Sequence, residues 1–60
     1  MTITVYNARV ALRMQSGDFF IWDEVTHLII DNDTLKIKMR NKRESGKFPV
    51  SLIRNCEIYY

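Results

Sequence analysis

Few side chains of this 60-residue chain could do chemistry. His27 is the one imidazole, and its ordinary pKa near neutrality would suit a general base. Cys56 is the one thiol, and a cation such as Arg54, two residues before it, could lower its pKa and make it a nucleophile. His27, however, fits an outward strand position and Cys56 an apolar one. We therefore expect no catalytic residue and no enzymatic activity.

Metal and cofactor sites are also not indicated. Asp31 and Asp33 flank a turn, but two carboxylates without a full loop of oxygen ligands are more typical of turn formation than of a cation site. A single Cys and a single His cannot complete a four-ligand zinc site. The chain also has no glycine-rich phosphate loop and no serine elbow. We expect neither a metal nor a cofactor.

The charges are distributed unevenly. Residues 1–33 carry two basic and five acidic side chains, a net charge of −3, whereas residues 34–60 carry seven basic and two acidic ones, a net charge of +5. The basic half could bind nucleic-acid phosphates, although its strand has no aromatic rings on the outer face for base stacking. It could equally be a solvated face, or attract the acidic half of a neighbouring copy. The basic residues concerned are Lys36, Lys38, Arg40, Lys42, Arg43 and Lys47.

Strands must position these groups, because apolar and polar residues alternate with period two and no helical period is sustained. The alternation is clearest at 8–14, where Arg9, Ala11 and Arg13 point outward, and at 34–40. Upstream, the parity of the apolar residues changes, which predicts a bulge near 5–7. Pro49 marks an edge strand, since it cannot donate to a ladder. The expected strands are 8–14, 19–22, 26–31, 34–40, 47–50 and 54–60.

A faint repeat organises these strands. Residues 20–30 recur as 48–58 with apolar groups at the same positions, each copy reading as strand, one-turn corner and strand, with the corners at 23–25 and 51–53. The repeat predicts an all-β single domain over 1–60, either a six-stranded antiparallel sandwich or a partly open barrel of the SH3-like or PH-like kind. The expected core is Val10, Leu12, Phe20, Trp22, Val25, Leu28, Ile30, Leu35, Ile37, Met39, Phe48, Val50, Ile53, Cys56 and Ile58.

Some apolar side chains remain outside this core. Phe19, Ile21 and Ile29 have the parity opposite to their inward neighbours, and Tyr59 and Tyr60 stand together at the end of the sequence. Exposed apolar groups and tyrosines are typical of protein interfaces. A chain this short has a small core, and its single cysteine cannot form an internal disulfide, so self-association would help to stabilise it. We expect a protein-binding module that acts as a homo-oligomer.

Two segments carry a resemblance to known proteins. Thr34 to Lys38 and Phe48 to Ile58 resemble, in their apolar spacing, short all-β proteins encoded by phages and prophages of Gram-positive bacteria. The resemblance implies a small intracellular protein that works by binding a host or phage protein. It implies no catalytic residues.

The location follows from what the sequence lacks. The first six residues have neither the charged start nor the apolar run of a secretory signal, and no segment approaches the 18 apolar residues of a membrane span. We expect a cytoplasmic protein with no membrane partner.

Overall fold

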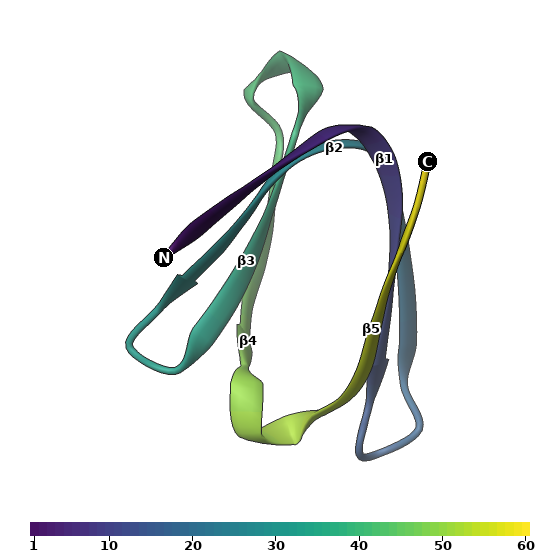
Figure 1. Ribbon diagram of the computed structural model, residues 1–60. Coiled ribbons are helices and arrows are strands. Elements are labelled where there is room, and N and C mark those ends of the chain that lie inside the picture. The colour runs from purple at the N-terminus through teal and green to yellow at the C-terminus, as the bar shows by residue number, and fades with distance from the viewer.

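A computed structural model describes residues 1–60 as five antiparallel strands in one open sheet (Figure 1). The strands follow the sheet order β4-β3-β2-β1-β5. Every neighbouring pair is antiparallel. Because β4 and β5 stand at the two ends of this order, they are the edges of the sheet. The strands are β1 (Thr2–Met14), β2 (Phe19–Asp31), β3 (Thr34–Met39), β4 (Glu44–Pro49) and β5 (Ile53–Tyr59), with 3-10 turns η1 (Arg40–Lys42) and η2 (Val50–Leu52) on either side of β4.

The two longest strands bend together. β1 and β2 each run for 13 residues, and their register shifts between Thr4 and Ala8 and again between Ala8 and Val10. Asn7 and Glu24 take positive φ angles of 54° and 57° at this point. The bulge expected near residues 5–7 is thereby confirmed. Figure 1 shows β1 and β2 curving over together, so that the sheet folds round its own inner face.

Because of this bend, the structure has fewer strands than expected. A helical corner at 23–25 would have divided 19–31 into two strands, whereas the structure accommodates the break in alternation as a bulge within continuous β2. A bulge adds one residue and twists the ladder without ending it. Five strands therefore form one open sheet, in place of the expected six, and no second sheet packs on it as in a sandwich. The second expected corner does form, as η2.

The bend has a cost at Glu24 that a glycine would avoid. Because a side chain in the left-handed region costs about 1–2 kcal/mol, we expect Glu24→Gly to raise the free energy of unfolding by about 0.5–1 kcal/mol and Glu24→Val to lower it by a similar amount or more. Urea denaturation followed by tryptophan fluorescence measures both. Glu24→Gln controls for the exposed ion pair with Arg40, 3.7 Å long. Equal stabilities for the Gly and Val variants would contradict the account.

The turn η2 connects the two halves of the curled sheet. The N–H of Val50 donates to the carbonyl of Asp33 at 2.8 Å, and the N–H of Gln15 donates to the carbonyl of Leu52 at 2.7 Å. These bonds fasten the turn to the β2–β3 hairpin at one end and to the end of β1 at the other. The β2–β3 hairpin itself closes through Asn32 and Asp33, both at positive φ (49° and 60°), as two-residue hairpins require.

The core lies on the inner face of the bend. Of the expected core residues, six are buried and five are half-buried against the cluster. The buried six are Val10, Leu12, Val25, Leu28, Leu35 and Ile37, and the half-buried five are Trp22, Ile30, Met39, Phe48 and Ile53.

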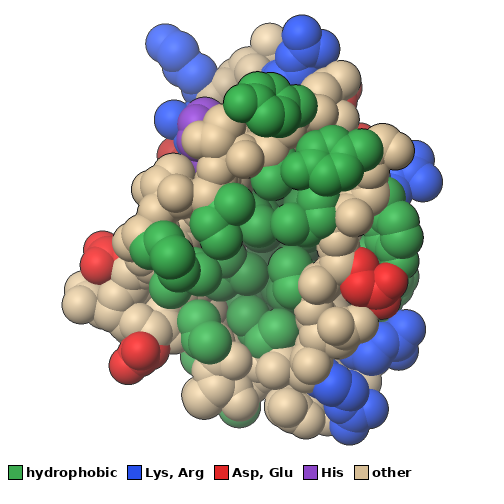
Figure 2. Space-filling model, in the orientation of Figure 1, with side chains coloured by type: hydrophobic (Ala, Val, Ile, Leu, Met, Phe, Trp, Pro, Cys, Tyr) green, Lys and Arg blue, Asp and Glu red, His purple; other side chains and the backbone are tan.

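Four expected core residues are exposed, namely Phe20, Val50, Cys56 and Ile58. Ile58 and Cys56 lie on edge strand β5, opposite the buried Val10 and Leu12, and no strand covers them on the other side. Figure 2 shows hydrophobic side chains gathered in the middle of this face, with charged groups around its margin. The open edge beside β5 is thus the reason that Cys56 and Ile58 were predicted wrongly.

Four buried residues were absent from the expected core, namely Val5, Ala8, Ala11 and Met14. Val5 and Ala8 are buried because the bend turns the first half of β1 onto the inner face. Three rings also pack at one end of this face: Phe20, Trp22 and Phe48 have centroid separations of 5.2 to 5.8 Å.

No helix is long and apolar enough to cross a membrane.

Candidate protein-binding site

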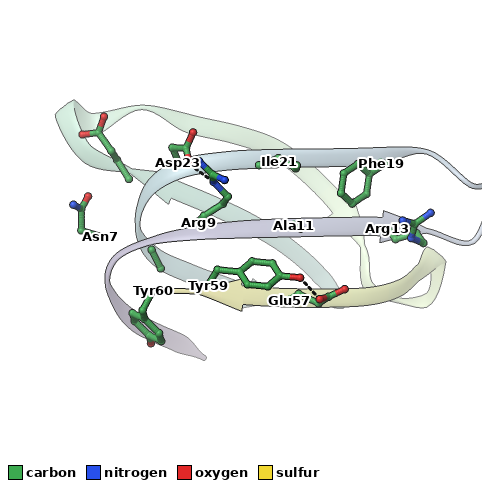
Figure 3. A pocket seen from close by; sticks show the side chains of 12 residues that line it. Asn7, Arg9, Ala11, Arg13, Phe19, Ile21, Asp23, Glu57, Tyr59 and Tyr60 are labelled. Atoms are coloured by element: carbon green, nitrogen blue, oxygen red, sulfur yellow. Dashed lines mark hydrogen bonds and ion pairs between the residues drawn. The ribbon is translucent and has the colours of Figure 1, made fainter.

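A groove of about 740 Å³ runs along the outer face of β1, between β2 and β5 (Figure 3). Its floor is set by the register of the three strands, because Ala11 lies opposite Ile21 on β2 and Glu57 on β5. Ala11 is 7% exposed, and its small side chain leaves a hollow between taller neighbours. The groove therefore exists because alanine stands where the outward alternation of β1 otherwise places arginine.

Apolar groups form the walls of this groove. Phe19 and Ile21 line it from β2, and Tyr59 and Tyr60 line it from the end of the chain. Phe19, Ile21 and Tyr59 are each about half exposed, and Tyr60 is 84% exposed. Side chains of this kind gain most when a partner covers them, since tyrosine and phenylalanine bury much area for little loss of conformational entropy.

The polar groups of the groove are largely committed to one another. Arg9 Nε lies 2.6 Å from Asp23 Oδ1, and this hydrogen bond, with the attraction between the charges, raises the pKa of Arg9. Tyr59 donates its hydroxyl hydrogen to Glu57, which raises the pKa of Tyr59. Arg13 has no carboxylate partner, and its guanidinium carbon lies 4.9 Å from the centre of the Phe19 ring.

The charge around the groove does not favour a phosphate ligand. Arg9 and Arg13 are the two cations, and the three carboxylates of Asp23, Glu24 and Glu57 outnumber them. Arginines beside aromatic rings could otherwise form a stacking site for single-stranded nucleic acid. The excess of negative charge would repel a phosphate backbone and accept a protein surface more readily.

Four of the five residues expected to bind protein meet at this groove. Phe19, Ile21, Tyr59 and Tyr60 all line it, although β2 and the end of the chain are far apart in sequence. Ile29 does not: it lies on the distal half of β2, half-buried between Thr2 and Lys36 of the neighbouring strands. No role was predicted for Ala11 or Arg13, although the alternation of residues 8–14 had already placed them on the outer face.

The basic residues occupy a different surface, on β3, η1 and β4. Lys36 lies 2.7 Å from Glu44, and its hydrogen bond and charge, with a smaller effect of Lys38, lower the pKa of Glu44. Lys36 also lies opposite Lys47 of β4. The one ring on these strands, Phe48, packs against the inner aromatic cluster. The structure thus separates this basic surface from the exposed rings of the groove.

The remaining chemistry-bearing residues do not assemble. His27 Nδ1 lies 2.9 Å from the Thr26 hydroxyl oxygen, and His27 is in register with Lys38 on the outer face. Asp31 accepts a hydrogen bond from the Thr34 hydroxyl at 2.6 Å through its main-chain carbonyl, as turn residues do. No group of three or more His, Cys, Asp or Glu side chains could hold a metal ion.

Cys56 is exposed but is not activated. Partial desolvation, with a smaller effect of the Glu57 charge, raises the pKa of its thiol from the ordinary value. A raised pKa leaves less thiolate at neutral pH. We therefore expect Cys56 to react with iodoacetamide more slowly at about pH 8 than the thiol of an unstructured peptide, and to reach half its maximal rate at a higher pH. A rate profile measured against pH tests this, and a midpoint below that of the unfolded chain in urea would contradict it.

Comparison of the chain with protein-family models, curated proteins and solved structures found no match. The class of molecule defined by the fold and the groove is a small all-β domain with one open antiparallel sheet.

Proposed function

We propose that this protein is a non-enzymatic protein-binding module whose binding surface is the outer-face groove. The observation that carries the proposal is the convergence of Phe19, Ile21, Tyr59 and Tyr60 around the hollow above Ala11. Half-exposed rings at the rim of a shallow depression, with a few charged groups beside them, are the composition of an interface core. The unpaired guanidinium of Arg13 adds a site for a carboxylate of the partner.

The proposal extends to the context of the protein. The resemblance to small all-β phage and prophage proteins supports a cytoplasmic role in which the groove binds a host or phage protein. The bend shared by β1 and β2 supports a partly open barrel of the SH3-like kind as the finer description of the fold. The limited core, with ten buried residues, supports action as a homo-oligomer.

Substitution of Ile21 tests the groove. Ile21 is 51% exposed, so Ile21→Asp leaves the core intact while placing a charge on the apolar wall. We expect affinity for the protein partner to fall by about 10-fold to 100-fold, as for a central interface residue. The measurement is affinity capture from a bacterial lysate, followed by titration calorimetry with the purified captured protein.

Two controls accompany this experiment. Lys38→Ala changes the basic surface and leaves the groove unchanged, so its affinity should match that of the unsubstituted protein. Nuclease treatment of the lysate removes partners that are held through nucleic acid. Unchanged affinity of the Ile21→Asp variant for the captured protein would contradict the assignment of the groove.

A second candidate function is nucleic-acid binding by the basic surface. Of its six basic residues, Lys38, Lys42, Arg43 and Lys47 make no ion pair in the structure, and they are free to contact phosphates. Titration with labelled single-stranded and double-stranded DNA and RNA distinguishes this function, because affinity for phosphates must weaken as salt rises. An Ile21→Asp variant would retain such binding, whereas a Lys38→Ala variant would lose part of it.

A further inference from the structure

The free edge of β5 is the least protected part of the sheet. β5 pairs with β1 on one side only, and no main-chain hydrogen bond outside the ladders involves residues 54–60. The other edge, β4, carries Pro49 and Lys47, which discourage strand pairing. β5 carries neither lysine nor proline, and beyond Arg54 its register with β1 is regular.

The residues of β5 alternate between the two faces. Asn55, Glu57 and Tyr59 point outward, in register with Arg13, Ala11 and Arg9, while Cys56 and Ile58 point inward, in register with the buried Leu12 and Val10. Arg54 is the extra residue of a bulge, since Asn55 pairs with Arg13 and Ile53 pairs with Met14. Residues 55–59 therefore form a regular strand with an unpaired edge and apolar groups exposed on both faces.

We propose that β5 pairs antiparallel with β5 of a second copy, around a two-fold axis that passes through Cys56. The proposal rests on the self-association that forms part of the proposed function, and it assigns the surface that carries it. Strand pairing satisfies the free N–H and C=O groups of the edge, which a helical partner would leave unpaired.

Symmetry restricts the register of the two strands, and charge disfavours one of the registers that remain. A two-fold axis perpendicular to the sheet pairs residues of the same face, so one residue must lie opposite its own copy. Glu57 on the axis would oppose two like charges, which is unfavourable for a cross-strand pair. With Cys56 on the axis, the amide of Asn55 in each copy lies opposite the carboxylate of Glu57 in the other copy, so this pair occurs twice.

The chemistry of that pair is already present within one chain. Asn55 Nδ2 donates to Glu57 Oε1 at 2.8 Å, so the amide and carboxylate can form the same bond across the axis. The dimer would have a continuous ten-stranded sheet, with both outer-face grooves on one side. Two grooves on one rigid face would make the protein a bivalent binder.

Charge substitutions on the full chain test the pairing. Sedimentation equilibrium is expected to show a reversible dimer for the unsubstituted protein. Asn55→Glu places a carboxylate opposite Glu57 of the second copy at two symmetric positions, so dimer dissociation should become about tenfold more favourable. The double variant Asn55→Glu with Glu57→Lys restores opposite charges at both positions and should recover the dimer. Both positions are exposed, and circular dichroism confirms that each variant folds.

The cysteine reports on the register. Oxidation under alkaline conditions, which increase the fraction of thiolate, should link Cys56 to Cys56 of the second copy faster than it links the control Cys56→Ser with Ser51→Cys, whose thiol lies away from the axis. Equal rates would overturn the register. A protein that stays monomeric, or a dimer unaffected by Asn55→Glu, would overturn the proposal. Binding of a protein partner at the groove would survive either result. These results test the self-association, whereas the affinity of the Ile21→Asp variant for the partner tests the groove separately.

Discussion

Leu12→Ala is expected to leave the protein largely unfolded at 25 °C. Leu12 is 0% exposed and lies on β1 between two strands, opposite Phe20 on β2 and Cys56 on β5. Truncating a buried leucine to alanine costs about 2–5 kcal/mol, because apolar contacts are lost and a cavity remains. A single small core rarely supplies more than about 3–5 kcal/mol in total. The substitution therefore removes most of the stability.

Urea denaturation followed by the fluorescence of Trp22 measures this loss. The matched control is Leu52→Ala, which deletes the same atoms from a side chain that is 52% exposed. The control should change the free energy of unfolding by less than about 1 kcal/mol. If both variants lost the same amount, Leu12 would not lie in the core that the structure describes. Raising the protein concentration should partly restore the Leu12→Ala variant if association stabilises the fold.

Trp22→Ala is expected to have the second-largest effect, a loss of about 2–3 kcal/mol. Full burial of a tryptophan would cost about 3–5 kcal/mol on truncation, and Trp22 is half-buried. Its ring centroid lies 5.8 Å from Phe20 in a stacked arrangement and 5.5 Å from Phe48 in an edge arrangement. Because these contacts connect β2 to edge strand β4, the loss should loosen the end of the curled sheet.

Circular dichroism during urea denaturation measures this second effect, since the variant has no tryptophan. Tyr6→Ala is the control, because it deletes an aromatic ring that is 81% exposed, and it should change stability by less than about 0.5 kcal/mol. A double-mutant cycle with Phe48→Ala should give a coupling of about 0.5–1.5 kcal/mol. A coupling near zero would mean that the two rings do not support each other.

Much of the candidate site could be predicted from the alternation of residues along single strands. The alternation at 8–14 placed Arg9, Ala11 and Arg13 on one face, and the parity at 19–22 placed Phe19 and Ile21 outward. Both held, because successive strand residues must point to opposite faces. Ile29 had the correct parity as well, but the bend at Glu24 puts it on a different part of the outer face, beside Lys36. Parity determines the face, and the bend determines which residues share a surface.

The number of strands shows more clearly what this alternation cannot predict. Asp23-Glu24-Val25 and Ser51-Leu52-Ile53 break the alternation in the same way, yet the first is a bulge within β2 and the second holds most of the 3-10 turn η2. The difference is their pairing. Val25 pairs with Ala8 on one side and Met39 on the other, so its neighbours hold the strand together through the break. Ser51 and Leu52 instead connect the two edge strands, β4 and β5, and pair with no strand.

The sequence by itself determined the all-β class, most of the turns and the face to which most side chains point, because each depends on neighbours a few residues apart. The tertiary structure alone decided that Ala11 would lie between Ile21 and Glu57, which are 10 and 46 residues away along the chain. It also decided that β5 would remain an open edge, which exposes Cys56 and Ile58. Both outcomes depend on the pairing of β5 with β1, which lie far apart in the sequence, and that pairing is a property of the whole sheet.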